Sequence, residues 1–433
     1  MHLSPTEKLT KWLKAYAENG YLNGAMLISV GGELIVNDGF GMANWEHRVP
    51  NTKATKFRIG SLTKSFTAAA IFQLYKKQAV DLHDPIGKYV EGVPNGDFIT
   101  IYHCLTHTSG IPDFAAAPDF WAKTMRLPST LGQLLESIKK REPGFPPGVE
   151  FEYSNSNYSI LTAIIEEASG LTYRDYLQEH ICGPLAMENT GCDDGTKLIP
   201  FLASGYTFWE EPLLAAYADM SFPLGAYGMY STVGDLFTWQ CALLSDDFLD
   251  GRLKEIMFKP NLEGYACGWM VSEISGKRCL NHFGDVSGYF SDFLTFPDED
   301  MAIIFLSNMN ITPVTHLTRQ AANILFGGDA ACPAPLAPVK IEDAIDYVGT
   351  FSLENRPGMP LTVYLEKEAL YLTVPKMYGV PYKFKLIPIH NDREATVFAT
   401  EMVNEQIIFV KQDKSSVQYI DYHGKRHNAF REI

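Results

Sequence analysis

The chain has 433 residues, of which 46% are hydrophobic and 20% charged, a composition typical of a soluble globular protein with two or three domains. Its formal net charge of −15 argues against nucleic acid and anionic membranes as partners, because both require a basic surface. No apolar run approaches the ~20 residues that a membrane-spanning helix requires.

The first residues predict an amphipathic helix. Leu9, Trp12, Leu13 and Tyr16 recur at helical spacing, which distinguishes this segment from a secretory signal peptide. We therefore expect a cytoplasmic protein, or else an exported protein whose leader has been removed. The seven cysteines form no Cys-x-x-Cys pair and no Cys/His metal spacing, so we expect free thiols and neither a metal nor another cofactor.

The next segments predict a sheet that is interrupted by a helical insertion. "GAMLISV" (24–30) and "ELIVND" (33–38) flank Gly31-Gly32, the pattern of a hairpin. Residues from about 62 to 244 are mainly helical in pattern. Strand character then returns in three segments, "KRCLNHFG" (277–284), "GYFSDFLTF" (288–296) and "MAIIFLSN" (301–308). We interpret these five strands as one antiparallel sheet of an α+β fold, with the functional site at its seam with the insertion.

A second unit is predicted after the sheet. Residues 327–340, "GGDAACPAPLAPVK", have the composition of a connector, and short alternating runs beyond them indicate a small antiparallel barrel or sandwich. The predicted organisation is a domain at 1–328 with its insertion at about 62–244, a linker at 329–340, and a C-terminal barrel at 341–433.

Ser61 and Lys64 are the first candidates for chemistry. They follow Gly60 at the start of a helix that is apolar on nearly every side, which indicates a buried helix. Lys64 lies one turn after Ser61, close enough to bond its oxygen, and burial lowers the pKa of a lysine so that it can accept a proton. A helix-capping serine and a lysine reaching solvent are the alternative. Ser137 and Lys140 have the same spacing, but their basic helix end favours a structural role.

Two later stretches of the sequence contain residues that could assist Ser61 and Lys64 in catalysis. Tyr153 could act as a general base beside a lysine, and Asn155 could orient a substrate carbonyl, although a helix cap explains this stretch more simply in isolation. His282 ends a strand, and Gly284 permits a close backbone approach. The Asp285 N–H could then form half of an oxyanion hole; the alternative is a hairpin with an incidental histidine.

The ordered set Ser-x-x-Lys, Tyr-x-Asn and His-x-Gly resembles the penicillin-recognising serine hydrolases. Within them it resembles the class C β-lactamase and DD-carboxypeptidase branch, which also includes esterases, D-aminopeptidases and acyltransferases. The resemblance covers roughly residues 20–326 and includes "CLTHTSGIPDF" (104–114), "PPGVEFEYSN" (146–155) and "GMYSTVGDL" (228–236). It implies a β-lactamase/transpeptidase-like fold: an antiparallel five-stranded sheet with flanking helices plus a helical insertion. The final barrel resembles the lipocalin-like domain of several members.

The resemblance also implies a role for each motif residue. Ser61 is the expected acylated nucleophile and Lys64 its proton partner. Tyr153 is the expected general base, which relays protons to the leaving group, and Asn155 holds the substrate amide. His282 stands where β-lactamases of this branch have a lysine. His107 and Ser109, in "HTSG", are interpreted as loop-forming and not catalytic.

The residues around His282 are expected to bind substrate. The N–H groups of Ser61 and Asp285 would form the oxyanion hole, with Phe283 and Gly284 beside them. The histidine moves the expectation from β-lactamases towards peptidases and esterases. The bulk of Phe283 and the charge of Asp285 argue against a substrate with a free carboxylate.

The sequence therefore predicts a serine hydrolase that acts through a Ser61 acyl-enzyme on an amide or ester. A peptidase or amidase of the DD-peptidase or D-aminopeptidase type is the first expectation, and a carboxylesterase or acyltransferase is the alternative. A catalytically weak penicillin-binding or sensor protein is the alternative of another class. The expected partner is a small-molecule or peptide substrate, and a homo-oligomer is an open option. Gly-x-Ser-x-Gly, His-Glu-x-x-His and P-loop motifs are absent.

Overall fold

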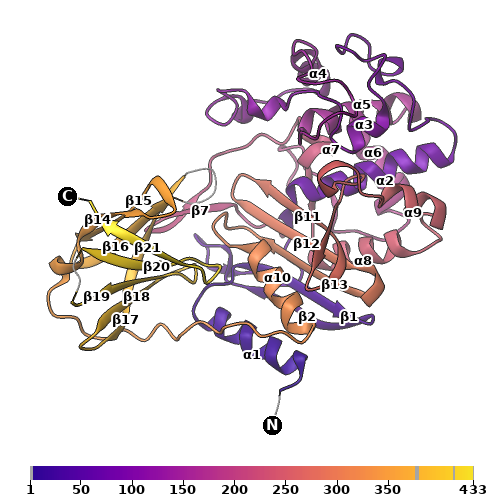
Figure 1. Cartoon of the computed structure of the whole chain (residues 1–433). Helices are drawn as coiled ribbons and strands as arrows, with labels where there is room; N and C mark the ends of the chain where they lie inside the picture. The colour runs from indigo at the N-terminus through magenta and orange to yellow at the C-terminus, as the bar shows by residue number, and fades with distance from the viewer. Residues whose placement is uncertain (1–2, 376–379, 413–414, 433) are drawn as a thin grey trace.

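The computed structural model describes residues 3–375, 380–412 and 415–432. Figure 1 shows a helical part above a central sheet, and a C-terminal barrel beside that sheet. Among the described residues, no helix has the length and apolar character needed to cross a membrane.

The central sheet has six strands in the order β10-β11-β12-β13-β1-β2. Its members are β1 (Gly24–Val30), β2 (Glu33–Phe40), β10 (Met270–Ile274), β11 (Lys277–Val286), β12 (Tyr289–Phe296) and β13 (Met301–Ser307). All neighbours are antiparallel, and β1 pairs with β13 so that the two early strands join the three late ones, as predicted. The expectation of five strands is corrected by β10. This edge strand has only five residues, and Ser272 and Glu273 interrupt its apolar residues, so its sequence lacks the apolar alternation of a strand.

Both faces of the sheet are covered. Helices α1 (Pro5–Glu18) and α10 (Val314–Leu325) pack on one face, against Met26, Ile28, Ile303 and Phe305 among others. The alternate side chains of the same strands face the helical part. Burial on both faces explains why β13 is apolar from Met301 to Leu306.

The helical part surrounds one buried helix. The helices here are α2 (Thr63–Lys76), α3 (Ile101–Leu105), α4 (Leu131–Ile138), α5 (Asn155–Ser169), α6 (Tyr173–Leu177), α7 (Leu224–Tyr227), α8 (Val233–Leu244) and α9 (Gly251–Met257). Helix α2 is buried along nearly its whole length and packs against α5 and α7, as its small and apolar residues predicted. Short strands lie outside the central sheet and the barrel: β3 (Met42–Asn44), β4 (Val49–Pro50), β5 (Phe57–Arg58), β6 (Gly191–Cys192), β7 (Tyr206–Trp209), β8 (Glu211–Leu214) and β9 (Met229–Ser231).

The C-terminal strands close into an eight-stranded antiparallel barrel. They are β14 (Gly349–Leu353), β15 (Arg356–Glu366), β16 (Ala369–Pro375), β17 (Pro381–Asn391), β18 (Ala395–Thr400), β19 (Gln406–Val410), β20 (Ser416–Ile420) and β21 (Arg426–Arg431). Alternate side chains fill its interior, which is the pattern that the sequence showed. The domain boundaries stay a prediction.

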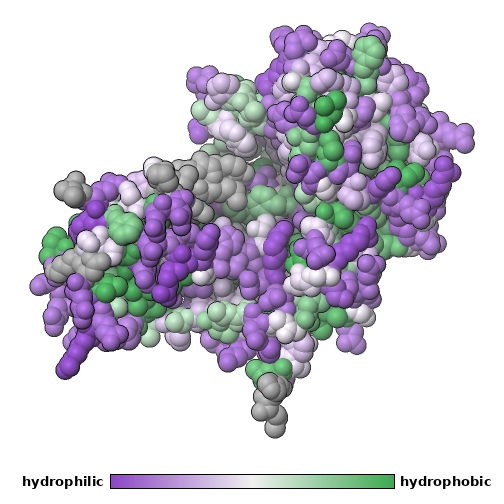
Figure 2. All heavy atoms as spheres, in the orientation of Figure 1, coloured by the Kyte–Doolittle hydropathy of each residue, from purple (hydrophilic) through white to green (hydrophobic). Residues whose placement is uncertain are grey.

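The β7–β8 hairpin packs against the barrel. Phe208 stacks on Phe384 of the barrel with ring centroids 5.4 Å apart, and Lys383 is paired with Glu210. Figure 2 shows a hollow between the helical part and the barrel, with hydrophobic side chains at its base. The barrel is therefore docked beside the sheet by specific contacts.

Candidate active site

Ser61 lies in a short 3-10 turn, Gly60–Leu62, which leads directly into α2. Gly60 has a φ of +54°, and a Cβ at this position would lie 2.6 Å from the Asp285 backbone nitrogen. A side chain at residue 60 is therefore excluded by both backbone strain and contact with β11. Gly60 therefore allows the turn that carries Ser61 to pack directly against the backbone of β11.

The structure brings Ser61 together with Lys64 and Tyr153. The Ser61 Oγ accepts hydrogen bonds from the Tyr153 hydroxyl at 2.8 Å and from the Lys64 Nζ at 3.0 Å. Lys64 also donates to the Asn155 Oδ1 at 2.8 Å and to the Ala226 carbonyl at 2.7 Å. The Lys64 ammonium thus uses all of its donors in a buried position, while Ser61 stays partly exposed.

Burial sets the protonation of Lys64. It lowers the pKa of Lys64 to about 7, against an opposing effect of the Asp113 carboxylate. A neutral amine is therefore available near neutral pH, directly beside the Ser61 hydroxyl.

His282 lies close to Lys64 and Tyr153, and its hydrogen bonds are those of a neutral imidazole. The His282 Nδ1 donates to the Phe283 carbonyl at 2.6 Å, so Nε2 is left to accept from the Tyr265 hydroxyl at 3.0 Å. Burial, with the Lys64 charge, lowers the pKa of His282 to about 3. The imidazole is neutral at neutral pH, and its ring centroid lies 6.2 Å from that of Tyr153.

Phe283 and Asp285 are directed towards the barrel side of the sheet. The Phe283 ring packs on Phe290 with centroids 5.3 Å apart and lines a cavity of about 510 Å³ between the sheet and the barrel. Asp285 pairs with Phe290 across the strands, and side chains of paired residues share one face. Asp285 and His282 are three residues apart on β11, so their side chains lie on opposite faces of the strand.

Two residues that were not sequence candidates for catalysis lie beside Tyr153 and Asn155. His107, interpreted as loop-forming, is fully buried, and its ring centroid lies 4.3 Å from that of Tyr153. Its Nδ1 accepts the Ser154 N–H at 3.1 Å. Asp113 accepts from both the backbone and the side chain of Asn155, each at 3.2 Å. No spacing signal in the sequence connects either residue with Tyr153 or Asn155, because the contacts cross between separate loops.

The second Ser-x-x-Lys pair behaves as its structural interpretation requires. Ser137 Oγ donates to the Leu134 carbonyl at 2.7 Å within α4, and α4 ends at Ile138, before Lys140. This pair provides a matched internal control for Ser61 and Lys64.

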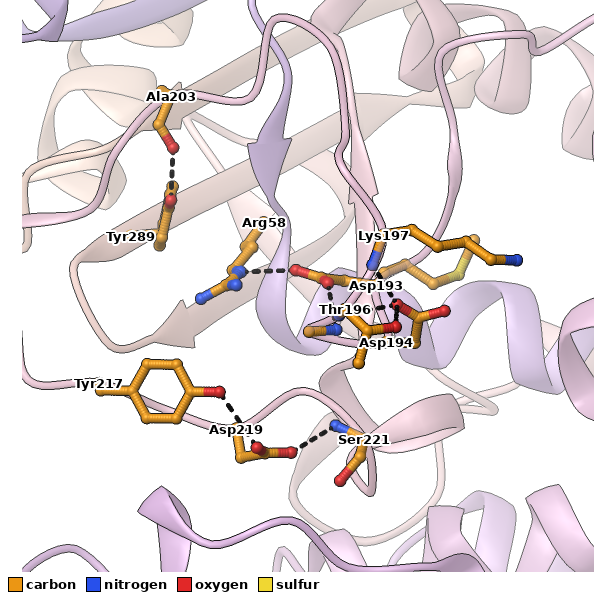
Figure 3. A network of polar contacts seen from close by, with 12 residues as sticks. Arg58, Asp193, Asp194, Thr196, Lys197, Ala203, Tyr217, Asp219, Ser221 and Tyr289 are labelled. Carbon is orange, nitrogen blue, oxygen red and sulfur yellow. Dashed lines mark hydrogen bonds and ion pairs between the residues drawn. The ribbon is translucent and has the colours of Figure 1, made fainter.

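A polar network supports the strand that precedes the nucleophile (Figure 3). Arg58 of β5 donates to Asp193 at 2.8 Å, and the carboxylate of Asp193 is almost fully buried. Just after β5, the Ser291 hydroxyl donates to the Ile59 carbonyl at 2.8 Å. The backbone next to Ser61 is thereby held, which limits the positions that its side chain can take.

In the described part of the chain, no cluster of His, Cys, Asp and Glu side chains could hold a metal ion. The groups available for chemistry are the Ser61 hydroxyl, the Lys64 amine and the Tyr153 phenol, which contact one another.

Comparison with known proteins supplies an independent view. Residues 9–326 match the family model described as Beta-lactamase. The chain is 29% identical over 410 residues to penicillin-binding protein 4* of Bacillus subtilis (strain 168), covering 86% of this chain and 88% of that one. The octameric penicillin-binding protein homologue from Pyrococcus abyssi superposes with a TM-score of 0.68 at 24% identity, over 98% of this chain and 99% of its own. The D-amino acid amidase from Ochrobactrum anthropi SV3 gives a TM-score of 0.66 at 22% identity, over 74% and 98%. Both of these structures share the fold of this chain.

Proposed function

Because the chain belongs to the beta-lactamase family, whose members are generally serine hydrolases, we propose that it hydrolyses an amide or ester through an acyl-enzyme on Ser61. The observation that carries the proposal is the pair of short hydrogen bonds from Tyr153 and Lys64 to the Ser61 Oγ. A serine oxygen with two titratable partners, in a partly exposed position beside a buried amine, has the arrangement of an activated nucleophile.

Proton transfer follows from the pKa of Lys64, which is lowered to about 7. Lys64 and Tyr153 contact the same Ser61 oxygen, so together they form a pair that can take up one proton from Ser61 once Lys64 is neutral. This pair accepts the Ser61 hydroxyl proton as Oγ bonds to the carbonyl carbon, and the carbonyl π electrons move to oxygen. The N–H groups of Ser61 and Asp285 hold the resulting oxyanion.

Collapse of the tetrahedral intermediate breaks the bond to the leaving nitrogen or oxygen. The pair of Lys64 and Tyr153 returns the proton to that leaving group, and the acyl group stays on Ser61. Water then attacks the ester and gives its proton to the same pair. The second tetrahedral intermediate releases the acid, and Ser61 recovers its proton.

Substrates without a free carboxylate beside the scissile bond suit this site. His282, where β-lactamases of this branch have a lysine, is neutral because burial lowers its pKa to about 3, so it offers no positive charge to a carboxylate. We therefore favour D-amino amides, amine-bearing peptides and esters as substrates. The fold shared with a D-amino acid amidase supports testing D-amino amides first. We expect repulsion by Asp285 to be weak, because its side chain lies on the face of β11 opposite His282.

The first experiment is active-site labelling with a fluorophosphonate and a fluorescent penicillin, followed by peptide mass spectrometry. We expect an adduct on Ser61 that Ser61→Ala abolishes and Ser137→Ala retains. An adduct on Ser137, or turnover of a substrate with no adduct under any acylating agent, would refute the assignment. D-amino amides, p-nitrophenyl esters and D-Ala-D-Ala peptides then rank the substrate classes.

The oligomeric state of the chain can be measured directly. A relative of the same fold is octameric, so light scattering coupled to size-exclusion chromatography tests whether this chain also forms a homo-oligomer. The cytoplasmic location expected from the N-terminal helix stays a prediction.

A further inference from the structure

We propose that Asp113 is a positioning residue of the active site, which orients the Asn155 amide so that its oxygen faces Lys64. This inference rests on the proposed function, because it concerns the group that activates Ser61. Asp113 lies just after the "HTSG" stretch and caps the 3-10 turn Phe114–Ala116.

The hydrogen bonds of Asp113 define the orientation of Asn155. The Asp113 Oδ1 accepts the Asn155 backbone N–H at 3.2 Å and the Ala115 N–H at 3.1 Å, while Oδ2 accepts the Asn155 side-chain Nδ2 at 3.2 Å. An ionised carboxylate can only accept, so it selects the NH2 end of the amide. The Asn155 Oδ1 is thereby turned towards Lys64, which donates to it at 2.8 Å.

The Asp113 loop is held in place independently of this carboxylate. The Arg141 guanidinium donates to the Asp113 backbone carbonyl at 2.9 Å. The Ser156 hydroxyl donates to the Pro112 carbonyl at 2.7 Å, and the Phe114 N–H donates to the same hydroxyl at 2.9 Å. A change confined to the Asp113 side chain therefore leaves the backbone anchors of the loop intact.

The groups that face Lys64 come from several elements. They are the ring of Tyr153, the ring of Tyr158 on α5, His107 from the loop before Asp113, and His282 on β11. Burial lowers the pKa of both histidines, so these two rings are uncharged near neutral pH.

Asp113 is the acidic group that opposes the effect of burial on Lys64. Burial lowers the pKa of Lys64 to about 7, and the Asp113 carboxylate raises it. Removal of that charge should therefore lower the pKa further. The reactive form of the Lys64–Tyr153 pair would then persist to lower pH.

Asp113→Asn separates orientation from charge. The new amide keeps the size of the side chain, but it sets an NH2 group against the NH2 of Asn155, so the Asn155 amide is expected to turn and withdraw its oxygen from Lys64. The measured quantity is the second-order rate constant for fluorophosphonate labelling of Ser61 as a function of pH. We expect a loss of at least ~10-fold at the plateau and an acid-limb midpoint at lower pH than in the wild type.

The exchange variant Asp113→Asn/Asn155→Asp provides the opposite perturbation. Its carboxylate, now at position 155, contacts Lys64 directly, and the new amide at position 113 can donate its NH2 to that carboxylate, so hydrogen-bond complementarity is restored. We expect its acid-limb midpoint to move to higher pH than in the wild type. This variant also serves the test if Asp113→Asn alone does not fold.

Asp194→Asn is the control, because the Asp194 carboxylate is paired with Arg174 at 2.7 Å, away from Ser61 and Lys64. We expect it to leave the midpoint unchanged. Midpoints equal to that of the wild type in both Asp113 variants would overturn the inference and assign Asp113 a role in loop structure only. Absence of Ser61 labelling in the wild-type protein would instead refute the proposed function itself, and the inference with it.

Discussion

Replacement of Lys64 by arginine tests whether the active site requires a neutral amine beside Ser61. Burial lowers the pKa of Lys64 to about 7, so about half of the wild-type molecules carry the reactive form at that pH. The neutral fraction of such a group falls to about one hundredth at pH 5, which predicts a ~50-fold lower labelling rate than at pH 7. An arginine stays protonated throughout this range.

Lys64→Arg should therefore remain at or below the acid level of the wild type, with a loss of at least ~10²-fold at pH 8. The assay is stopped-flow labelling of Ser61 by a fluorophosphonate between pH 5 and pH 9, with circular dichroism to verify folding. Lys140→Arg is the control, because Lys140 lies beyond the end of α4, and its profile should match the wild type. A flat wild-type profile, or a Lys64→Arg variant that keeps near-full reactivity at pH 8, would show that proton transfer uses another group.

Three further predictions concern the surroundings of Ser61. Tyr153→Phe removes the hydroxyl that donates to Ser61 at 2.8 Å and should lower kcat by at least ~10²-fold without unfolding the protein; near-full turnover would exclude Tyr153 as the proton relay. His107→Phe leaves the buried Ser154 N–H without its acceptor and should lower the free energy of unfolding by ~1–3 kcal/mol in urea titrations; an unchanged midpoint would show that another group replaces the imidazole. Asp285→Asn should change the ratio of kcat/KM for a D-Ala-D-Ala peptide and its C-terminal amide by less than ~3-fold, since the carboxylate lies on the face of β11 opposite His282; a marked gain for the free acid would show that Asp285 repels the substrate carboxylate.

The sequence was informative wherever a residue's environment is encoded by its neighbours along the chain. The burial of α2 follows from small and apolar residues on nearly every side of one helix, and that burial separates Ser61 and Lys64 from the otherwise identical pair Ser137 and Lys140. The five apolar strands and the alternating barrel strands were recognisable for the same reason. The edge strand β10 was not, because it has only five residues and Ser272 and Glu273 interrupt its apolar residues.

Local pattern by itself thus indicated most strands of the central sheet and of the barrel, and it predicted that a serine and a lysine would share one buried helix turn. Only the tertiary structure decided which distant groups contact that pair. Tyr153 reaches Ser61 from another loop, and Asp113 orients Asn155 across a further one. The face taken by Asp285 also depended on tertiary structure, because strand register sets which face of β11 carries that carboxylate. Such contacts have no period along the chain, since they arise from the packing of segments that lie far apart in the sequence and meet only in the folded structure.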